Sequence, residues 1–194
     1  MAKPSDGYKI EALRERFGNG YRPRFIYFWK PTVKRGNISP ACFCQWYLSP
    51  FTIDGVEYKT TEHWMMASKA RLFGDVQSER RILQTESPAT VKKMGRQVKN
   101  FDEDVWLRER YNIVLKGNVA KFNQHPTLKE NLLETGDSVI VEASPFDRIW
   151  GIGMKEGDEG IDDPRQWKGL NLLGFAIMDA REELQRRSVQ GLST

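Results

Sequence analysis

Residues 51–70 read FTIDGVEYKTTEHWMMASKA, a stretch whose pattern changes from strand to helix. Asp54-Gly55 lies between β-branched and aromatic residues, and this arrangement is a strong signal for a β-hairpin. Thr60 or Thr61 can then cap a helix that continues through EHWMM. We therefore expect a short hairpin that leads directly into a helix, which indicates a mixed α and β fold.

The rest of the sequence contains more helical segments than strands. Ser87-Pro88, Asp102 and His125-Pro126 are typical first residues of helices, and Gly136 is a typical residue after one. The fold class that we predict is α+β, a mainly α-helical single domain with a few short strands. Further strands are expected at 24–29 and 138–143, and further helices at about 87–98, 102–123, 126–135 and 170–184.

The length and composition fit one domain with one core, because 39% of the 194 residues are hydrophobic. Residues 1–20 are polar and are interrupted by Gly18 and Gly20, so we expect a flexible N-terminal segment there. The domain should cover residues 21–185, and residues 186–194 should form a polar tail.

Cysteine usage argues against a disulfide or a metal. Cys42 and Cys44 form a C-x-C pair, which is too close for a comfortable disulfide and lacks the further ligands of a zinc site. We expect no metal, no cofactor and a reducing, cytoplasmic setting. No apolar run approaches the roughly 20 residues that cross a membrane, and the charged N-terminus is unlike a secretory signal.

The charge balance permits an anionic ligand without requiring one. The net charge is +4 and the sequence pI is about 9.0, values that suit a phosphate or a nucleic acid but occur in many soluble domains. Residues 22–35, RPRFIYFWKPTVKR, hold five basic and four aromatic residues. We interpret them mainly as a buried strand that enters a basic loop, which can hold a nucleic acid near a pocket.

Glu62 and Lys69 lie seven residues apart in the predicted helix, so both leave one face, separated by about 10.5 Å along its axis. That separation is too long for an ion pair and suits a small sugar held between a carboxyl group and an amine. Apolar neighbours favour a raised carboxyl pKa and a lowered amine pKa, as acid–base and amine-nucleophile chemistry require. The alternative is a helix-start charge and a solvated lysine. His63 is a candidate substrate contact that can equally be packed or capping.

Residues 139–153, VIVEASPFDRIWGIG, form a second candidate segment. A predicted strand ends at Glu142, and a turn then presents Asp147. Glycines let backbone N–H groups approach a phosphate, and an aromatic ring beside them can stack on a base or a ribose. The alternative is a tight turn around a core tryptophan. The residues that we assign to phosphate or stacking contacts here are Trp150, Gly151 and Gly153.

Six motifs follow one another between residues 49 and 184: SPFTIDGVEYKTTEHWMMASKA, MGR at 94–96, Trp106, AKFNQHPTLKENLLETG, VEASPFDRIWGIGM and GLNLLGFAIMDAREEL. Their order and spacing resemble the NADAR (YbiA-like) superfamily of N-glycosidases over roughly residues 25–184. The chain departs from that family at Cys44-Gln45-Trp46, where Ser-Asn-Phe is usual, and at Trp64, where Tyr or Phe is usual. The loop at 154–168 is also longer than in compact members.

The resemblance implies an enzyme that cleaves the N-glycosidic bond between a ribose carbon and a nitrogen base or amine, without a metal. Known members act on phosphoribosylated intermediates of riboflavin synthesis, and others remove ADP-ribose from guanine in modified nucleic acid. The family's catalytic glutamate falls on Glu62 and its helix lysine on Lys69. Further ligand contacts suggested by motif positions are Arg96, Trp106, Lys121 and Asn171, although Lys121 can equally be a structural helix charge and Asn171 can cap the last helix.

Two routes are open for such a reaction. In the first, Glu62 handles protons while Asp147 or Glu142 supplies negative charge that stabilises an oxocarbenium-like ribose. In the second, Glu62 helps to open the ribose ring, and Lys69 attacks C1 as a neutral amine to form an imine. We favour the second, because it explains why a lysine shares the helix face with the glutamate.

Two other classes of protein are alternatives. A non-catalytic module that binds ADP-ribose or nucleotides can lack Glu62 or Lys69, and this chain has both. A nucleic-acid binding protein needs clustered basic residues with interleaved aromatic residues. Among substrates, the basic charge and the loop at 30–42 favour ADP-ribosylated guanine in nucleic acid, with ADP-ribose as the product ligand, over phosphoribosylamino-pyrimidines.

Overall fold

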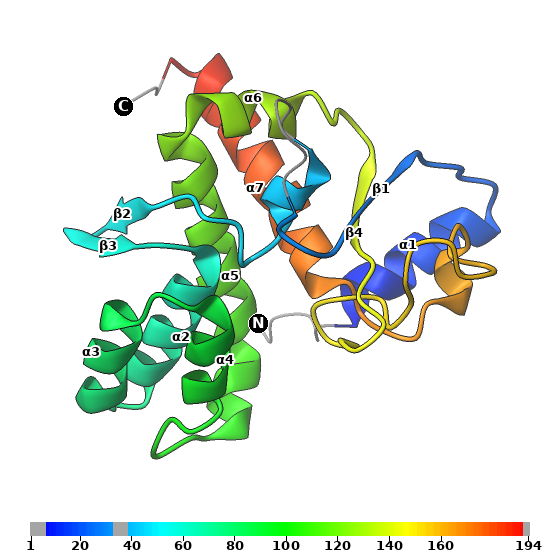
Figure 1. The fold of residues 1–194 in the computed structure, drawn as a ribbon. Coiled ribbons are helices and arrows are strands. Elements are labelled where there is room, and N and C mark those ends of the chain that lie inside the picture. The colour runs from blue at the N-terminus through cyan, green and yellow to red at the C-terminus, as the bar shows by residue number, and fades with distance from the viewer. Residues whose placement is uncertain (1–6, 33–38, 192–194) are drawn as a thin grey trace.

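The computed structural model describes residues 7–32 and 39–191, and helices dominate this part of the chain (Figure 1). The long helix α5 runs through the centre, with α7 packed against it, while α2, α3 and α4 gather beside its first half. The predicted α+β fold with mainly helical content is confirmed. The helices and strands are α1 (Tyr8–Gly18), β1 (Phe25–Phe28), β2 (Phe51–Ile53), β3 (Val56–Tyr58), α2 (Thr61–Leu72), α3 (Val76–Gln84), α4 (Pro88–Gly95), α5 (Glu103–Gln124), α6 (Pro126–Leu133), β4 (Val139–Glu142) and α7 (Leu172–Val189).

The stretch 51–70 folds as its sequence predicts. β2 and β3 form an antiparallel hairpin, and Asp54 and Gly55 turn between them with φ of 52° and 79°. The side-chain oxygen of Thr60 accepts a hydrogen bond from the backbone N–H of His63, so Thr60 caps α2. The hairpin and the cap therefore fix where the first turn of α2 begins.

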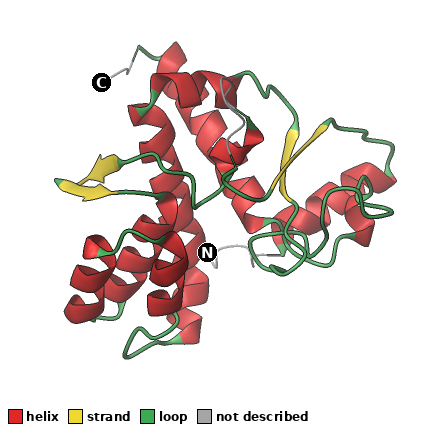
Figure 2. Ribbon diagram, viewed as in Figure 1, coloured by secondary structure: helices red, strands yellow, loops and turns green. Residues whose placement is uncertain are grey.

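The strands lie in two separate places (Figure 2). Away from the hairpin, β1 pairs with β4 in parallel, and Phe28 is the partner of Glu142 in the register. The backbone N–H of Ala143 donates to the oxygen of Phe28 at 2.8 Å, which continues the pairing by one residue. Because parallel strands end at the same edge, the residues that follow β1 lie beside the residues that follow β4.

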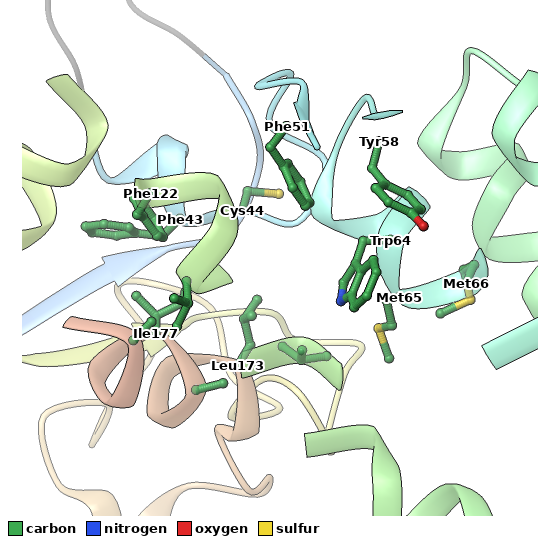
Figure 3. Packing of buried hydrophobic residues seen from close by; sticks show 14 of the residues in the cluster. Phe43, Cys44, Phe51, Tyr58, Trp64, Met65, Met66, Phe122, Leu173 and Ile177 are labelled. Carbon is green, nitrogen blue, oxygen red and sulfur yellow. The ribbon is translucent and has the colours of Figure 1, made fainter. Parts of the chain in front are cut away.

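The main apolar core lies between α2, α5, α7 and the hairpin (Figure 3). The ring of Tyr58 meets the ring of Trp64 edge-to-face, with centroids 5.0 Å apart. The indole N–H of Trp64 donates to the backbone oxygen of Ile113 in α5 at 2.6 Å. These contacts attach α2 to the hairpin and to α5 and so fix the position of α2.

The N-terminal segment differs from the expectation of a flexible chain. α1 is a helix in which Ile10, Leu13 and Phe17 are buried, in a second apolar cluster that includes Val139 and Val141 of β4. Apolar residues three and four apart form one face of a helix, and that face covers the parallel strand pair. At the other end, α7 continues to Val189, so residues 186–189 of the expected tail are helical.

Candidate active site

Glu62 and Glu142 each have a buried carboxyl group, and the two lie close enough for the charge of Glu62 to raise the pKa of Glu142. Glu62 lies in the first turn of α2 and is 3% exposed, while Glu142 is the last residue of β4. The Oε2 atom of Glu142 is inaccessible to solvent and has no hydrogen-bond partner among the described residues. An unpaired buried carboxyl oxygen is costly, so the atom is expected to hold a proton or to meet a ligand.

Burial raises the pKa of both carboxyl groups. The pKa of Glu62 is raised to about 7, first by loss of solvent, with Lys92, a hydrogen bond from Trp46 and Arg96 acting in the opposite direction. The pKa of Glu142 is raised to about 8 by the same loss of solvent and by the charges of Asp147 and Glu62. Between about pH 7 and pH 8 the pair therefore carries about one proton in total, so one group can act as an acid while the other acts as a base.

Asn171 holds the end of β4 that carries Glu142. Its Oδ1 accepts the backbone N–H of Glu142 at 3.0 Å, and its Nδ2 donates to the oxygen of Ile140 at 2.9 Å. The side chain is fully buried, and its backbone is left-handed, with φ of 54°. Asn171 is the N-cap residue of α7, as the sequence predicted, but its side chain makes no capping hydrogen bond and instead positions the strand that carries Glu142.

We predict that Asn171→Ala destabilises the fold by about 2 kcal/mol and lowers kcat, because it removes two buried hydrogen bonds and strains a left-handed backbone. Asn171→Gly accepts φ of 54° and should recover part of the stability while kcat stays low. Urea unfolding with parallel assays measures both effects. Equal stability of the two variants would show that the backbone conformation contributes nothing.

Asp147 organises the turn that follows β4. Its Oδ1 accepts the backbone N–H groups of Ile149 at 2.9 Å and Trp150 at 2.8 Å, and its Oδ2 lies 3.9 Å from Nζ of Lys92. Its charge contributes to the raised pKa of both Glu62 and Glu142. Asp147 is thus brought to the carboxyl pair as the sequence predicted, held in place by backbone donors.

The glycines after Trp150 serve close packing. The backbone N–H of Gly153 already donates to the oxygen of Asp147 at 3.0 Å, so this N–H is not free for a phosphate as predicted. A Cβ on Gly151 would lie 2.9 Å from the backbone oxygen of Glu142, which excludes larger residues. Trp150 is half-buried and packs against the main core, which fits the turn around a core tryptophan that was the alternative.

Lys92 and Arg96 supply positive charge beside Glu62. They lie four residues apart, at the end of α4, and both lower the pKa of Glu62. Arg96 is exposed and remains a candidate contact for a phosphate, as its motif position suggested. Sequence reasoning missed Lys92, although the i,i+4 spacing from Arg96 is a signal that the two share a helix face.

Gln45 and Trp46, in the segment before the hairpin, also contact Glu62, and the sequence analysis assigned neither of them to the site. The backbone oxygen of Gln45 accepts the N–H of Glu62 at 3.0 Å, while Trp46 hydrogen-bonds to its side chain. The Oε1 of Gln45 is buried without a hydrogen-bond partner among the described residues. The segment that departs from the family's usual Ser-Asn-Phe therefore contacts Glu62, and this departure is the signal that could have identified it.

Lys69 lies among aromatic rings. Its Nζ is 4.1 Å from the ring centroid of Phe101 and 5.3 Å from that of Trp106. Burial lowers the pKa of Lys69, so more of it is the neutral amine. The structure therefore brings Lys69 and Trp106 together, but Lys69 is not among the described charged groups that shift the pKa of Glu62.

Lys121 and His63 have structural positions. Lys121 is fully buried, its Nζ donates to the backbone oxygen of Cys42 at 2.5 Å, and burial lowers its pKa to about 8. His63 is held between Oγ1 of Thr60 at 2.8 Å and the oxygen of Thr85 at 2.9 Å. Both side chains are buried and hydrogen-bonded within the protein, which is the arrangement of the structural alternative, and substrate contact at these two residues stays a prediction.

The basic loop that the sequence analysis singled out lies only partly within the described residues. The part of the basic loop at 33–38 lies outside them, so the expected nucleic-acid rim is not described there. Within residues 7–32 and 39–191, no group of three or more His, Cys, Asp or Glu side chains is arranged to hold a metal ion. In the same ranges, no helix is long and apolar enough to cross a bilayer.

The fold agrees with the family that the sequence resembles. The chain belongs to the NADAR family, because residues 27–185 match the family model described as NADAR domain. An N-glycosidase of Acanthamoeba polyphaga mimivirus is 42% identical over 169 residues, covering 84% of this chain and 98% of that protein.

Bacterial relatives include the N-glycosidase YbiA of Escherichia coli, which is 29% identical over 170 residues, covering 88% of this chain and 94% of that protein. The NMR structure of E. coli YbiA superimposes with a TM-score of 0.69 at 26% identity, covering 87% of this chain and 89% of that one. A riboflavin biosynthesis protein of Vibrio vulnificus is 29% identical over 167 residues, which cover 86% of this chain and 40% of that protein.

Proposed function

We propose that this chain is a hydrolase of N-glycosyl bonds that removes ADP-ribose from ADP-ribosylated guanine in nucleic acid. The observation that carries the proposal is the buried pair Glu62 and Glu142, whose pKa values are raised to about 7 and about 8, so that they hold about one proton between these pH values. The relatives named N-glycosidase support the reaction class. Lys92 and Arg96 beside the pair suit an anionic substrate.

In the proposed reaction the protonated carboxyl group gives its proton to the leaving nitrogen as the bond to C1 of the ribose breaks. The ionised carboxyl group stabilises the positive charge that develops on the ribose and then takes a proton from the attacking water. Asp147, fixed by two backbone N–H groups, adds a negative charge that does not need to move. The proton belongs to the pair of glutamates and not to either one alone.

Lys69 supports a variant of this route through an imine. Its pKa is lowered by burial, and a neutral amine can attack C1 once the ribose ring has opened. We expect borohydride, added during turnover, to trap a sugar adduct on Lys69 that peptide mass spectrometry locates. Lys69→Arg keeps the cation without a nucleophile and should give no adduct; full turnover by that variant would exclude the imine and leave the oxocarbenium route.

We predict a bell-shaped pH profile of kcat/KM. A pair with pKa values of about 7 and about 8 holds two protons well below pH 7 and none well above pH 8. Since one acid and one base are needed, kcat/KM should be highest between these values and fall about tenfold per pH unit outside them. A profile that stays flat from pH 5 to pH 10 would contradict the proton-sharing pair.

The direct test is release of ADP-ribose from ADP-ribosylated guanine in single-stranded DNA by wild type, Glu62→Gln and Glu57→Gln. Glu57 is an exposed residue of the hairpin, so its variant is a matched control for loss of one carboxylate. Activity in wild type and the control, but not in Glu62→Gln, supports the proposal. Activity only on phosphoribosylamino-pyrimidines would replace the substrate by the alternative that the Vibrio relative's name suggests.

We further propose that the enzyme acts in a reducing, cytoplasmic compartment. Cys42 and Cys44 are free and buried in the structure, and burial raises the pKa of both thiols. Thiols that are buried and protonated are compatible with a compartment in which no disulfide is needed.

A further inference from the structure

Phe146 is a large apolar side chain that the fold leaves in solvent. It is 87% exposed, although it lies only four residues after Glu142. Four residues of chain span at most about 14 Å, so this ring is within reach of a ligand that occupies the carboxyl pair. An exposed aromatic ring beside a catalytic site is more informative than an exposed apolar residue elsewhere.

The loop that carries Phe146 is firmly held. The backbone N–H groups of Ser144 and Ile152 both donate to the oxygen of Glu142, at 2.9 and 3.0 Å. The next residue, Asp147, accepts two backbone N–H groups through its side chain. A ring presented by such a loop loses little freedom when a ligand packs on it, which favours binding.

Trp29 braces Phe146 from the neighbouring strand. The two rings lie with centroids 6.1 Å apart at an angle of 50°. Trp29 directly follows Phe28, which pairs with Glu142, so the contact forms at the shared edge of β1 and β4. On Trp29 itself, Nζ of Lys30 lies 4.6 Å from the ring centroid, which leaves Phe146 as the more open aromatic surface.

We propose that Phe146, braced by Trp29, stacks on the nucleobase that leaves in the reaction and so selects substrates with an aromatic leaving group. The inference rests on the proposed function for the identity of the site, and it adds the residue that recognises the base. A flat ring on the loop that follows Glu142 suits a base whose glycosidic nitrogen must lie at the carboxyl groups. Base stacking on aromatic side chains tolerates different bases. The stacking platform formed by Phe146 and Trp29 therefore selects an aromatic base and not one particular nucleic-acid sequence.

Binding of guanosine 5′-monophosphate and of ribose 5-phosphate, measured by calorimetry, tests the platform. The variants are Phe146→Ala, Phe146→Tyr and, as a control of equal exposure far along α7, Val189→Ala, since Val189 is 88% exposed. Phe146→Ala should weaken binding of the nucleotide about tenfold, while Phe146→Tyr and Val189→Ala stay within about twofold of wild type. Binding of ribose 5-phosphate should be the same in all four proteins.

Kinetics separate this proposal from the proposed function. With an N-glycoside that is turned over, Phe146→Ala should raise KM about tenfold and leave kcat within about twofold. Wild-type nucleotide binding by Phe146→Ala, or no nucleotide binding by wild type, would overturn the platform even if glycosidase activity is found. Nucleotide binding that depends on Phe146 in a protein with no glycosidase activity would uphold the platform and refute the proposed reaction.

Discussion

Replacing Glu62 with glutamine should abolish turnover, by about a thousandfold or more, and should make the protein more stable at pH 8. The carboxyl group is 3% exposed, and its pKa is raised from 4.5 to about 7, mainly by burial. Each pKa unit corresponds to about 1.4 kcal/mol, so the ionised side chain weakens the fold by on the order of 3 kcal/mol. A neutral amide of the same shape removes that cost and the proton chemistry together.

The sign of the stability effect depends on pH. The folded protein holds the proton of Glu62 up to about pH 7, whereas the unfolded chain releases it near pH 4.5. The folded state thus binds more protons in this window, and stability falls as the pH rises through it. Glu62→Gln should match wild type at pH 4 and exceed it at pH 8, as measured by urea unfolding.

Glu57→Gln is the control for this experiment, because its carboxyl group is exposed on the hairpin. It should leave both activity and the pH dependence of stability unchanged. If Glu62→Gln were less stable than wild type at pH 8, the ionised carboxylate would have to be stabilised by its neighbours, and the proton-sharing pair would be wrong. Retained activity in Glu62→Gln would remove the residue from the catalytic site altogether.

The sequence predicted those parts of the fold that local chemistry specifies. Asp54-Gly55 predicts the hairpin. The side chains of the N-cap residues Thr60, Ser87 and Asp102 each accept a hydrogen bond from a backbone N–H where a helix begins. α1 was missed because its glycines were given more weight than the spacing of Ile10, Leu13 and Phe17, although that spacing was visible in the sequence. The local signal for the helix was therefore present and was misread.

The site was predicted less completely than the fold, because it depends on contacts between distant segments. Glu62 was predicted from its place in a capped helix, its spacing from Lys69 and the family resemblance, but the groups around it come from α4 and from the segment before the hairpin. The parallel pairing of β1 with β4 places Trp29 next to Glu142, and no local pattern in the sequence announces that pairing. Long-range pairing of this kind is set by the packing of the whole domain.

The positions of two glycines and an asparagine near the site also depend on long-range packing. Gly151 and Gly153 were predicted to give N–H groups to a phosphate, and Asn171 was predicted to cap the last helix or touch a ligand. In the structure they satisfy the backbone of β4 and of the turn behind Glu142. A motif shows that a residue type is required at a position, and the structure shows that here the requirement is close packing behind the carboxyl pair.

Gly174→Ala should therefore be one of the most damaging single-methyl additions in the chain. A Cβ on Gly174 would lie 2.1 Å from the backbone oxygen of Ile140 and 2.5 Å from Nδ2 of Asn171, the two atoms that bond to each other. The backbone of β4 or α7 must shift to admit the methyl group, which costs about 3 kcal/mol by analogy with overpacked cores. Since Asn171 holds Glu142, kcat should fall as well, and urea unfolding with activity assays measures both losses.

Two other glycine-to-alanine changes give this prediction its control. Gly18, at the end of α1, has open space around it, so Gly18→Ala should be neutral or stabilise the protein by up to about 1 kcal/mol. A Cβ on Gly95 would meet the thioether of Met66, a flexible chain end that can move aside, so Gly95→Ala should cost less than Gly174→Ala. The expected order of stability is Gly18→Ala, then Gly95→Ala, then Gly174→Ala. If Gly174→Ala were as stable and as active as Gly18→Ala, the hydrogen bond from Asn171 to the backbone oxygen of Ile140 could not be what fixes the position of Glu142.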